Sequence, residues 1–217
     1  MTNHRSEKTR ARILDAAERL ILERGLDGVG MEGVAEAAGV SRQAVYDKFG
    51  SKGGLLRAMV ERTEESLGIF KAVGAVAAEP DGLKKLTTLC DLSRVSEPGV
   101  APFIRVMYAA RLHDETAAAL MEERLAARYM VMRHVVEQLD SEGRLRASLT
   151  VEKGTDILWS ILNPLHYDNL VTSRGWTIHE YRVHIEVMAR AGLLGEAPGP
   201  VKASLDAGLR KAEEATA

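Results

Sequence analysis

Cysteines and long apolar runs are scarce in this 217-residue chain, and each shortage excludes a class of protein. The single cysteine, Cys90, excludes an internal disulfide and any metal site built from several cysteines, and it fits a reducing cytoplasm. The histidines show no clustered ligand spacing either, so we expect no metal and no cofactor. No window approaches the roughly 20 consecutive apolar residues of a membrane span. The first residues are basic with no apolar stretch behind them, so we expect no secretory signal.

The net charge of the chain is also small, at -2, but the charged residues are unevenly distributed. Residues 1–62 carry 11 Lys and Arg against 9 Asp and Glu, whereas the remainder carries 18 against 22. The asymmetry allows a local phosphate-binding face but does not establish one. Hydrophobic residues make up 46% and charged residues 28%, values that do not suggest disorder and that permit a sizeable core.

Apolar residues recur at helical spacing through nearly the whole chain, and no alternating strand pattern is found. In the first third, the pattern and its glycine and serine boundaries predict helices over 9–24, 31–38, 42–49 and 52–76. Further helices are predicted over 82–95, 100–111, 114–141, 151–173 and 177–194, with Pro164 kinking the 151–173 helix. The predicted fold class is therefore all-α.

Residues 31–49, MEGVAEAAGVSRQAVYDKF, form a helix, a short turn with glycine, and a second helix, which is the helix-turn-helix pattern. Gly39 can adopt the positive φ of the turn, and Ser41 can cap the second helix. That helix would fit the major groove of DNA, where Arg42, Gln43 and Ala44 can contact base edges. Tyr46, Lys48 and Lys52 can contact phosphates.

The stretch 9–62 closely resembles the DNA-binding domain of the TetR (tetracycline repressor) family. The resemblance is carried by TRARILDAAERLILERG and by VAEAAGVSRQAVYDKFGSKGGLL, above all by the AAGVS turn, the Tyr46 and Phe49 pair and the Ser51-Lys52 step. It implies a three-helix DNA-binding head joined by a fourth helix to a larger helical body for ligand binding and dimerisation. It also implies a cytoplasmic homodimer that represses transcription from a near-palindromic operator until a small molecule releases it.

The chain departs from the family pattern at three places. Val29 and Gly30 stand where Ser or Thr usually caps the second helix, so that cap and its phosphate contact are expected to be missing. Lys48 stands where His is frequent. Gly53-Gly54 follows Lys52 where an acidic residue is frequent, so we expect the fourth helix to start loosely, at roughly 1 kcal/mol per glycine.

The body holds two sets of candidate residues, and for each of them ordinary core packing is the competing interpretation. Apolar and aromatic residues with a few polar ones are candidates for a ligand pocket: Phe103, Met107, Tyr108, Met121, Leu125, Tyr129, Met132, Trp159, Asn163 and His166. Stripes on the last two helices are candidates for the dimer interface: Leu158, Ile161, Leu165, Tyr181, His184, Ile185 and Met188.

We therefore expect three segments: an arm and helix-turn-helix domain over 1–52, a ligand-binding and dimerisation domain over 53–195, and a tail over 196–217 that is a short helix or disordered. Two alternatives stay open. The head could answer to a protein partner, with no small-molecule pocket. Less favoured is an all-α enzyme with a structural tri-helical unit, because the sequence offers no paired nucleophile and base, no metal cluster and no phosphate loop.

Overall fold

The computed structural model describes residues 2–194, apart from the side chains of 2–5 and 94–97. Across these residues every regular element is a helix and no strand occurs, which confirms the all-α prediction. No helix in this part of the chain combines the length and apolar character that crossing a membrane would require. The segment predicted as a tail, 196–217, lies outside the described residues.

The chain divides into two compact units, and each is described by itself. The first unit comprises the residues up to Gly68 together with Pro102–Ala126, and the second comprises Ile69–Ala101 together with the residues from Ala127 onward. Long helices α6 (Gly82–Ala110) and α7 (Glu115–Ser141) contribute residues to both units. The functional boundary predicted between residues 52 and 53 stays a prediction.

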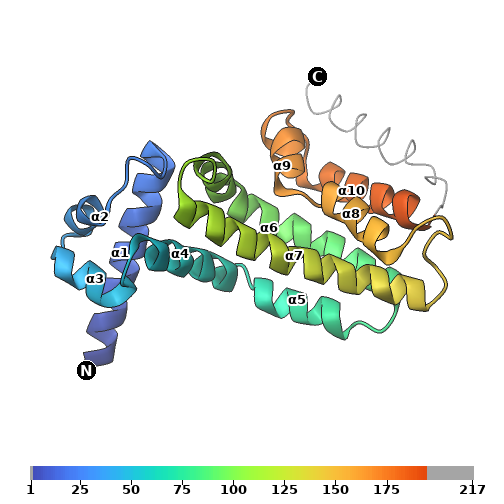
Figure 1. Ribbon diagram of the computed structural model, residues 1–217, viewed down its shortest axis with the longest axis horizontal. Coiled ribbons are helices and arrows are strands. Elements are labelled where there is room, and N and C mark those ends of the chain that lie inside the picture. Colours follow the sequence, from blue (N-terminus) through green and yellow to red (C-terminus); the bar gives the residue numbers. More distant parts are fainter. Residues whose placement is uncertain (1, 195–217) are drawn as a thin grey trace, which may run out of the picture. The chain divides into compact units, whose positions relative to one another are not determined.

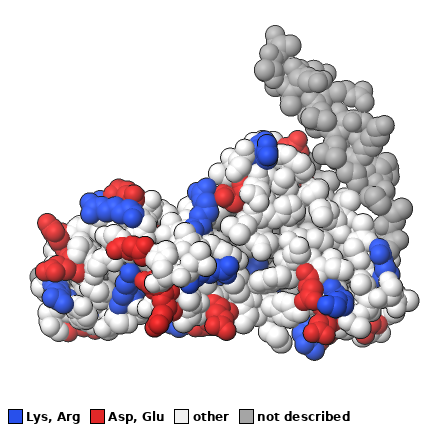
Figure 2. All heavy atoms as spheres, turned by 45° about the horizontal axis from the view of Figure 1, so that its top comes forward, with Lys and Arg blue, Asp and Glu red and all other residues white. Residues whose placement is uncertain are grey.

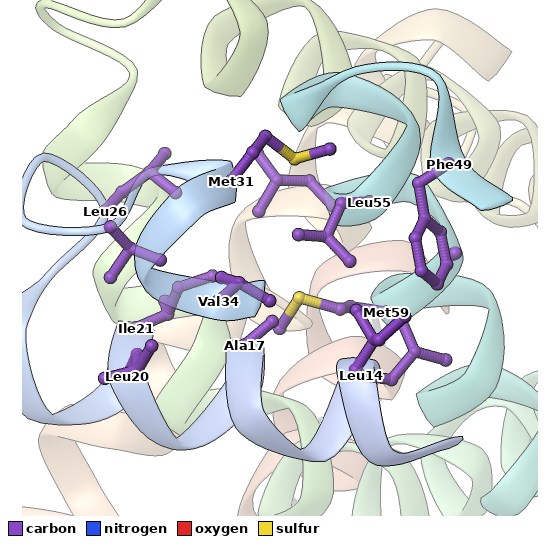
Figure 3. Close-up of a cluster of buried hydrophobic side chains, with 14 of the residues drawn as sticks. Leu14, Ala17, Leu20, Ile21, Leu26, Met31, Val34, Phe49, Leu55 and Met59 are labelled. Atoms are coloured by element: carbon purple, nitrogen blue, oxygen red, sulfur yellow. The ribbon is translucent and has the colours of Figure 1, made fainter. Parts of the chain in front are cut away.

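Four helices near the N-terminus build the head of the first unit (Figure 1). They are α1 (Thr2–Arg24), α2 (Met31–Ala38), α3 (Arg42–Phe49) and α4 (Lys52–Ser66). Figure 3 shows their apolar side chains pointing toward one another, including Leu14, Ile21, Val34, Phe49 and Leu55, all of them buried. Burial of these side chains, at about 25 cal/mol per Å² of apolar surface, holds α2 and α3 in fixed places on α1 and α4.

The corners between the head helices follow from single residues. Gly39 has a φ of 62°, the left-handed conformation that glycine adopts without strain, and it ends α2. The Ser41 hydroxyl accepts a hydrogen bond from Ala44 N at 3.2 Å, and that of Ser51 accepts one from Gly54 N at 3.1 Å. At the start of α2, Gly30 provides no side-chain cap, as its residue type predicted. The predicted bounds of α2 and α3 are confirmed.

The second unit is built from α5 (Ile69–Ala78), parts of α6 and α7, α8 (Val151–Ile161), α9 (Pro164–Tyr167), the π-helix η1 (Asp168–Thr172) and α10 (Ile178–Leu194). Its core is apolar and draws on all the longer helices, with Leu86, Val135, Leu158 and Ile185 fully buried.

Several predicted helices have different bounds in the structure. The single helix predicted over 52–76 is two helices, α4 and α5, because Gly68 adopts a φ of 65° that ends the first. The helices predicted over 82–95 and 100–111 are one helix, α6, which continues through Pro98. Leu89, Cys90 and Ala101, on both sides of Pro98, are buried in the same cluster, so tertiary burial outweighs the helix-breaking tendency of proline.

The predicted helix over 151–173 does not kink at Pro164 but ends before it. Leu162 terminates α8, and the side chain of Asn163 accepts a hydrogen bond from Leu165 N at 2.9 Å to cap α9. Pro164 then occupies the first position of α9, where its missing N–H has no consequence.

Candidate nucleic-acid interface

Helix α3 has one buried face and one exposed face. Val45 and Phe49 anchor it in the core of the head, whereas Arg42, Gln43 and Tyr46 are exposed. Ala44 and Lys48, on the borders between the two faces, are half-buried. Helix α3, which has eight residues, therefore carries all three residues predicted to contact bases. It also carries Tyr46 and Lys48, two of the three residues predicted to contact phosphates.

The exposed side chains of α3 are ordered by contacts with one another. The Arg42 guanidinium lies 5.4 Å from the centre of the Tyr46 ring, a cation–π arrangement. A hydrogen bond with Tyr46 raises the pKa of Arg42 above its ordinary value, so this side chain keeps its positive charge at any physiological pH. Gln43 Nε2 donates a hydrogen bond at 2.6 Å to Oδ1 of Asp47, which lies one turn further along the helix.

The first helix supports α3 and the turn before it. The Lys48 ammonium donates to Ser6 Oγ at 2.9 Å, which joins the basic N-terminal stretch to the end of α3. The Arg12 guanidinium donates to the carbonyl oxygens of Ala38 and Gly39, the groups that end α2. From the sequence, Arg12 is one of several basic residues near the N-terminus, because helical spacing does not show which carbonyl a long side chain reaches.

Lys52 is engaged inside the first unit. Its Nζ lies 3.1 Å from the Leu26 carbonyl oxygen and 3.2 Å from Asp114 Oδ2. The Asp114 side chain also accepts from Ala117 N at 2.9 Å and so caps the first turn of α7. The predicted phosphate contact of Lys52 stays a prediction, and in this arrangement phosphate and Asp114 would compete for the same ammonium group. From the sequence, Asp114 is only the first residue of the helix predicted over 114–141.

Three more charged side-chain pairs lie within the first unit, one between two turns and two between α4 and α7. His113 Nε2 lies 2.7 Å from Asp27 Oδ2. Arg57 of α4 donates to Glu123 of α7 at 2.7 Å. The third pair, Arg124 with Glu64, also joins α7 to α4, at 3.1 Å. Helix α4 is therefore tied to α7 by charged groups along its length.

Charge on the surface is mixed in sign. Figure 2 shows basic and acidic side chains interspersed on the face that it draws. This agrees with the small positive excess of residues 1–62. Binding to DNA would therefore depend on where individual cations such as Lys48 lie rather than on a uniformly basic face.

The predicted pocket residues fall into two groups in separate units. Phe103, Met107, Tyr108, Met121 and Leu125 belong to or pack against the core of the first unit, where Met107 is fully buried and Met121 is 3% exposed. The other five belong to the second unit: Tyr129, Met132, Trp159, Asn163 and His166. Of these, Tyr129 and Trp159 meet edge to face at 5.9 Å, and the side chain of Asn163 caps α9. Their role as a ligand pocket stays a prediction.

Four of the seven residues predicted for the dimer interface are buried within one protomer. Leu158, Ile161, Tyr181 and Ile185 are at most 6% exposed, so their helical periodicity is explained by the core of the second unit. Leu165 and His184 are half-buried, and Met188 is 39% exposed. His184 packs against Trp176 and His166, with ring centres 5.1 Å and 5.6 Å away. Burial, with a smaller contribution from His166, lowers the pKa of His184.

Comparison with known proteins identifies the head. Residues 13–59, which run from α1 into α4, match the family model described as bacterial regulatory proteins, tetR family. Residues 13–59 therefore form a DNA-binding head of the TetR-family type. The resemblance inferred from the AAGVS turn and the residues around it is thereby confirmed.

The curated relatives, named as HTH-type transcriptional regulators, match over a limited part of this chain. The regulator TtgR of Pseudomonas putida is 37% identical over 65 residues, which cover 30% of this chain and 31% of TtgR. The matched part thus spans about a third of the length of the first curated relatives, 31% to 34%.

Solved structures extend the similarity over both units. NalD of Pseudomonas aeruginosa, the secondary repressor of the MexAB-OprM multidrug efflux pump, superposes with a TM-score of 0.66 at 26% identity. The match covers 89% of this chain and 100% of NalD. SmeT, in its complex with triclosan, has a TM-score of 0.72 at 19% identity over 89% of this chain and 97% of SmeT, which shows a shared fold.

Proposed function

We propose that the protein is a transcriptional repressor that binds operator DNA as a homodimer and is released by a small molecule. The observation that carries the proposal is the exposed face of α3, with Arg42, Gln43 and Tyr46 held on a TetR-family head. The similarity to NalD, a named repressor, supports the direction of control. The curated relatives are named as transcriptional regulators, so we assign the chain no catalytic reaction, and we place it in the cytoplasm beside the chromosome.

Recognition would combine base contacts and phosphate contacts. Arg42 can donate two hydrogen bonds to guanine, Gln43 can pair with adenine, and the Ala44 methyl can pack on a thymine methyl. The Tyr46 hydroxyl and the Lys48 ammonium would fix the register on the phosphates. A two-fold dimer would place two such helices about 34–36 Å apart, one turn of DNA, and so require a near-palindromic operator.

The ligand response would act through helices that serve both units. Helices α6 and α7 contribute to the second unit, and their connection at Asp114 holds Lys52 at the start of α4. An effector that prefers a different arrangement of α6 and α7 would change the contacts of α7 with α4, such as the one between Arg57 and Glu123. It can shift the population only by its difference in affinity for the two states.

Binding to the DNA upstream of the protein's own gene, compared with random DNA over a series of salt concentrations, tests the proposal. We expect a clear preference for the upstream DNA and a steep loss of affinity with salt, because bound cations release counterions. Lys48→Ala should weaken binding to all sequences and reduce the salt slope, whereas Arg42→Ala should relax specificity at one base pair by about 1–3 kcal/mol.

Arg133→Ala is the matched control for these variants, because Arg133 is an exposed residue of α7 in the second unit that pairs with Glu137. It should bind both DNAs like the parent protein. Absence of binding to either DNA at low salt would reject the proposal, and equal losses on both DNAs for Arg42→Ala would reject the role of that residue.

A further inference from the structure

Gln43 and Asp47 are the most outward-facing residues of α3. Successive residues of an α-helix are about 100° apart, so these two lie roughly opposite the buried pair Val45 and Phe49. Both side chains are exposed, and they are one helical turn apart. Any surface that binds the exposed face of α3 would therefore contact Gln43 and Asp47.

A carboxylate on this face needs an explanation under the proposed function. Asp47 is an acidic residue of α3 among basic Arg42 and Lys48. Close to DNA its charge is repelled by phosphates, so it lowers affinity for every sequence alike. In the structure its Oδ1 accepts the hydrogen bond from Gln43 Nε2 at 2.6 Å. That contact indicates that Asp47 affects the orientation of the Gln43 side chain.

The contact determines which way the Gln43 amide faces. An ionised carboxylate can only accept hydrogen bonds, so the amide nitrogen of Gln43, not its oxygen, must turn toward Asp47. One N–H of Gln43 is then occupied, and its oxygen and second N–H stay available. An acceptor beside a donor is the pattern that matches N6 and N7 of adenine in the major groove.

We infer that Asp47 is a positioning residue for base readout: it holds the Gln43 amide in the orientation that recognises adenine. The inference rests on the proposed function and deepens it, because it gives Asp47 a role in specificity at a cost in overall affinity. Removing the carboxylate should therefore tighten binding to random DNA and weaken the discrimination between bases.

Selection from a library of randomised DNA duplexes, using the full chain, tests this inference. The wild-type protein defines the preferred site, and Gln43→Ala identifies the base pair that Gln43 reads. Asp47→Ala should lower the preference for adenine at that same pair by up to the discrimination that a good bidentate contact contributes, about fivefold or more. Asp47→Asn should lower it less, because its amide oxygen can still accept from Gln43 but its NH₂ no longer forbids the flipped orientation. Asp47→Glu, which restores an acceptor, should recover most of the preference.

Two controls separate orientation from charge and from direct contact. Glu36→Gln removes one exposed negative charge from α2 and should tighten random binding without altering base preference. In a Gln43→Ala background, Asp47→Ala should have no further effect on base preference, because the two residues act as one unit.

The possible failures are distinguishable. Unchanged base preference in Asp47→Ala overturns the inference and leaves the proposed function standing. A loss of base preference at a different base pair also overturns the inference, because Asp47 would then contact a base itself. The same holds if Asp47→Ala still changes base preference in the Gln43→Ala background. If the wild-type protein selects no sequence at all, both the proposed function and this inference are rejected.

Discussion

At the scale of single residues, Gly54 shows why this chain departs from the family pattern at the start of α4. A Cβ placed on Gly54 would lie 1.9 Å from the carbonyl oxygen of Phe49, a backbone atom that cannot move aside cheaply. The helix begins at Lys52 under the cap from Ser51, and its predicted loose start stays a prediction. The close approach between α3 and α4 therefore requires a glycine that helix propensity alone disfavours.

Gly54→Ala should destabilise the protein. We expect the free energy of unfolding to fall by about 1–3 kcal/mol, as for other overpacked sites. Gly33→Ala is the control in the same head, because nothing lies within 4 Å of a Cβ at that position of α2. It should stabilise by up to about 1 kcal/mol. Urea denaturation of the two variants measures both effects, and a stabilised Gly54→Ala protein would contradict the close approach.

Asp114 is the residue through which the α6–α7 connection holds Lys52. Burial opposes its ionisation, but the hydrogen bond from Ala117 N and the Lys52 ammonium outweigh burial and lower the pKa of Asp114 below its ordinary value. A lowered pKa in the folded state means that the carboxylate stabilises the fold above the unfolded pKa, and that this contribution is lost as pH falls.

Asp114→Asn should retain the cap on α7 and lose the charge that pairs with Lys52. We expect the variant to be less stable than wild type by up to about 1 kcal/mol above about pH 5. The difference should narrow as pH falls below about 4, where the wild-type carboxylate takes up its proton. Urea denaturation over a pH series measures it. A difference that is constant with pH would show that the charge of Asp114 does not stabilise the fold.

At the scale of elements, the head could be predicted closely because its boundaries depend on local chemistry. Gly39, Ser41 and Ser51 act through their own backbone or a hydroxyl a few ångströms away, and a sequence shows such effects directly. Gly68 is a signal of the same kind that was overlooked, since a glycine at positive φ ends α4.

Elements of the body were harder to predict because distant contacts decide them. Pro98 lies within α6 only because residues on both sides of it are buried in one cluster. Met107 and Tyr181 show the same difficulty for sites, because helical periodicity reports burial and does not distinguish a core from a pocket or a dimer interface. The exposed face of α3 could be predicted from the sequence, because the cap residue and the core residues of the helix determine which side chains face outward.

The contact of α9 with α10 contains a titratable group in a partly apolar setting. His184 of α10 packs against His166 and Trp176, and burial together with His166 lowers the pKa of His184. As pH falls below the ordinary histidine value of 6.5, the unfolded chain takes up a proton at this residue before the folded chain does. The free energy of unfolding should therefore fall with pH in this range.

His184→Gln should reduce this loss of stability. The urea midpoints at about pH 7.5 and about pH 5.5 should differ less for the variant than for wild type. His179→Gln is the matched control on the same helix, because His179 is exposed, and it should retain the wild-type difference. Identical pH dependence in wild type and His184→Gln would locate the titrating group elsewhere.

At the scale of the whole molecule, the proposed function requires a dimer that connects two α3 helices to one operator. The buried residues of α8 and α10 cannot contact a partner, so a dimer interface on these helices would have to use their exposed apolar residues. Met188 of α10 is 39% exposed, and a charge placed there within an interface would lose its water without gaining a partner.

Met188→Glu should dissociate the dimer and leave each protomer folded. Sedimentation should show the mass of one chain, and circular dichroism should show unchanged helicity. Operator binding should weaken strongly, because each half-site would then be bound without the effective concentration that the linked second head provides. Met130→Glu on α7 is the matched control, because Met130 is 59% exposed and lies outside the predicted interface. If Met188→Glu stays dimeric and Met130→Glu dissociates, the interface lies on α7 rather than on α10.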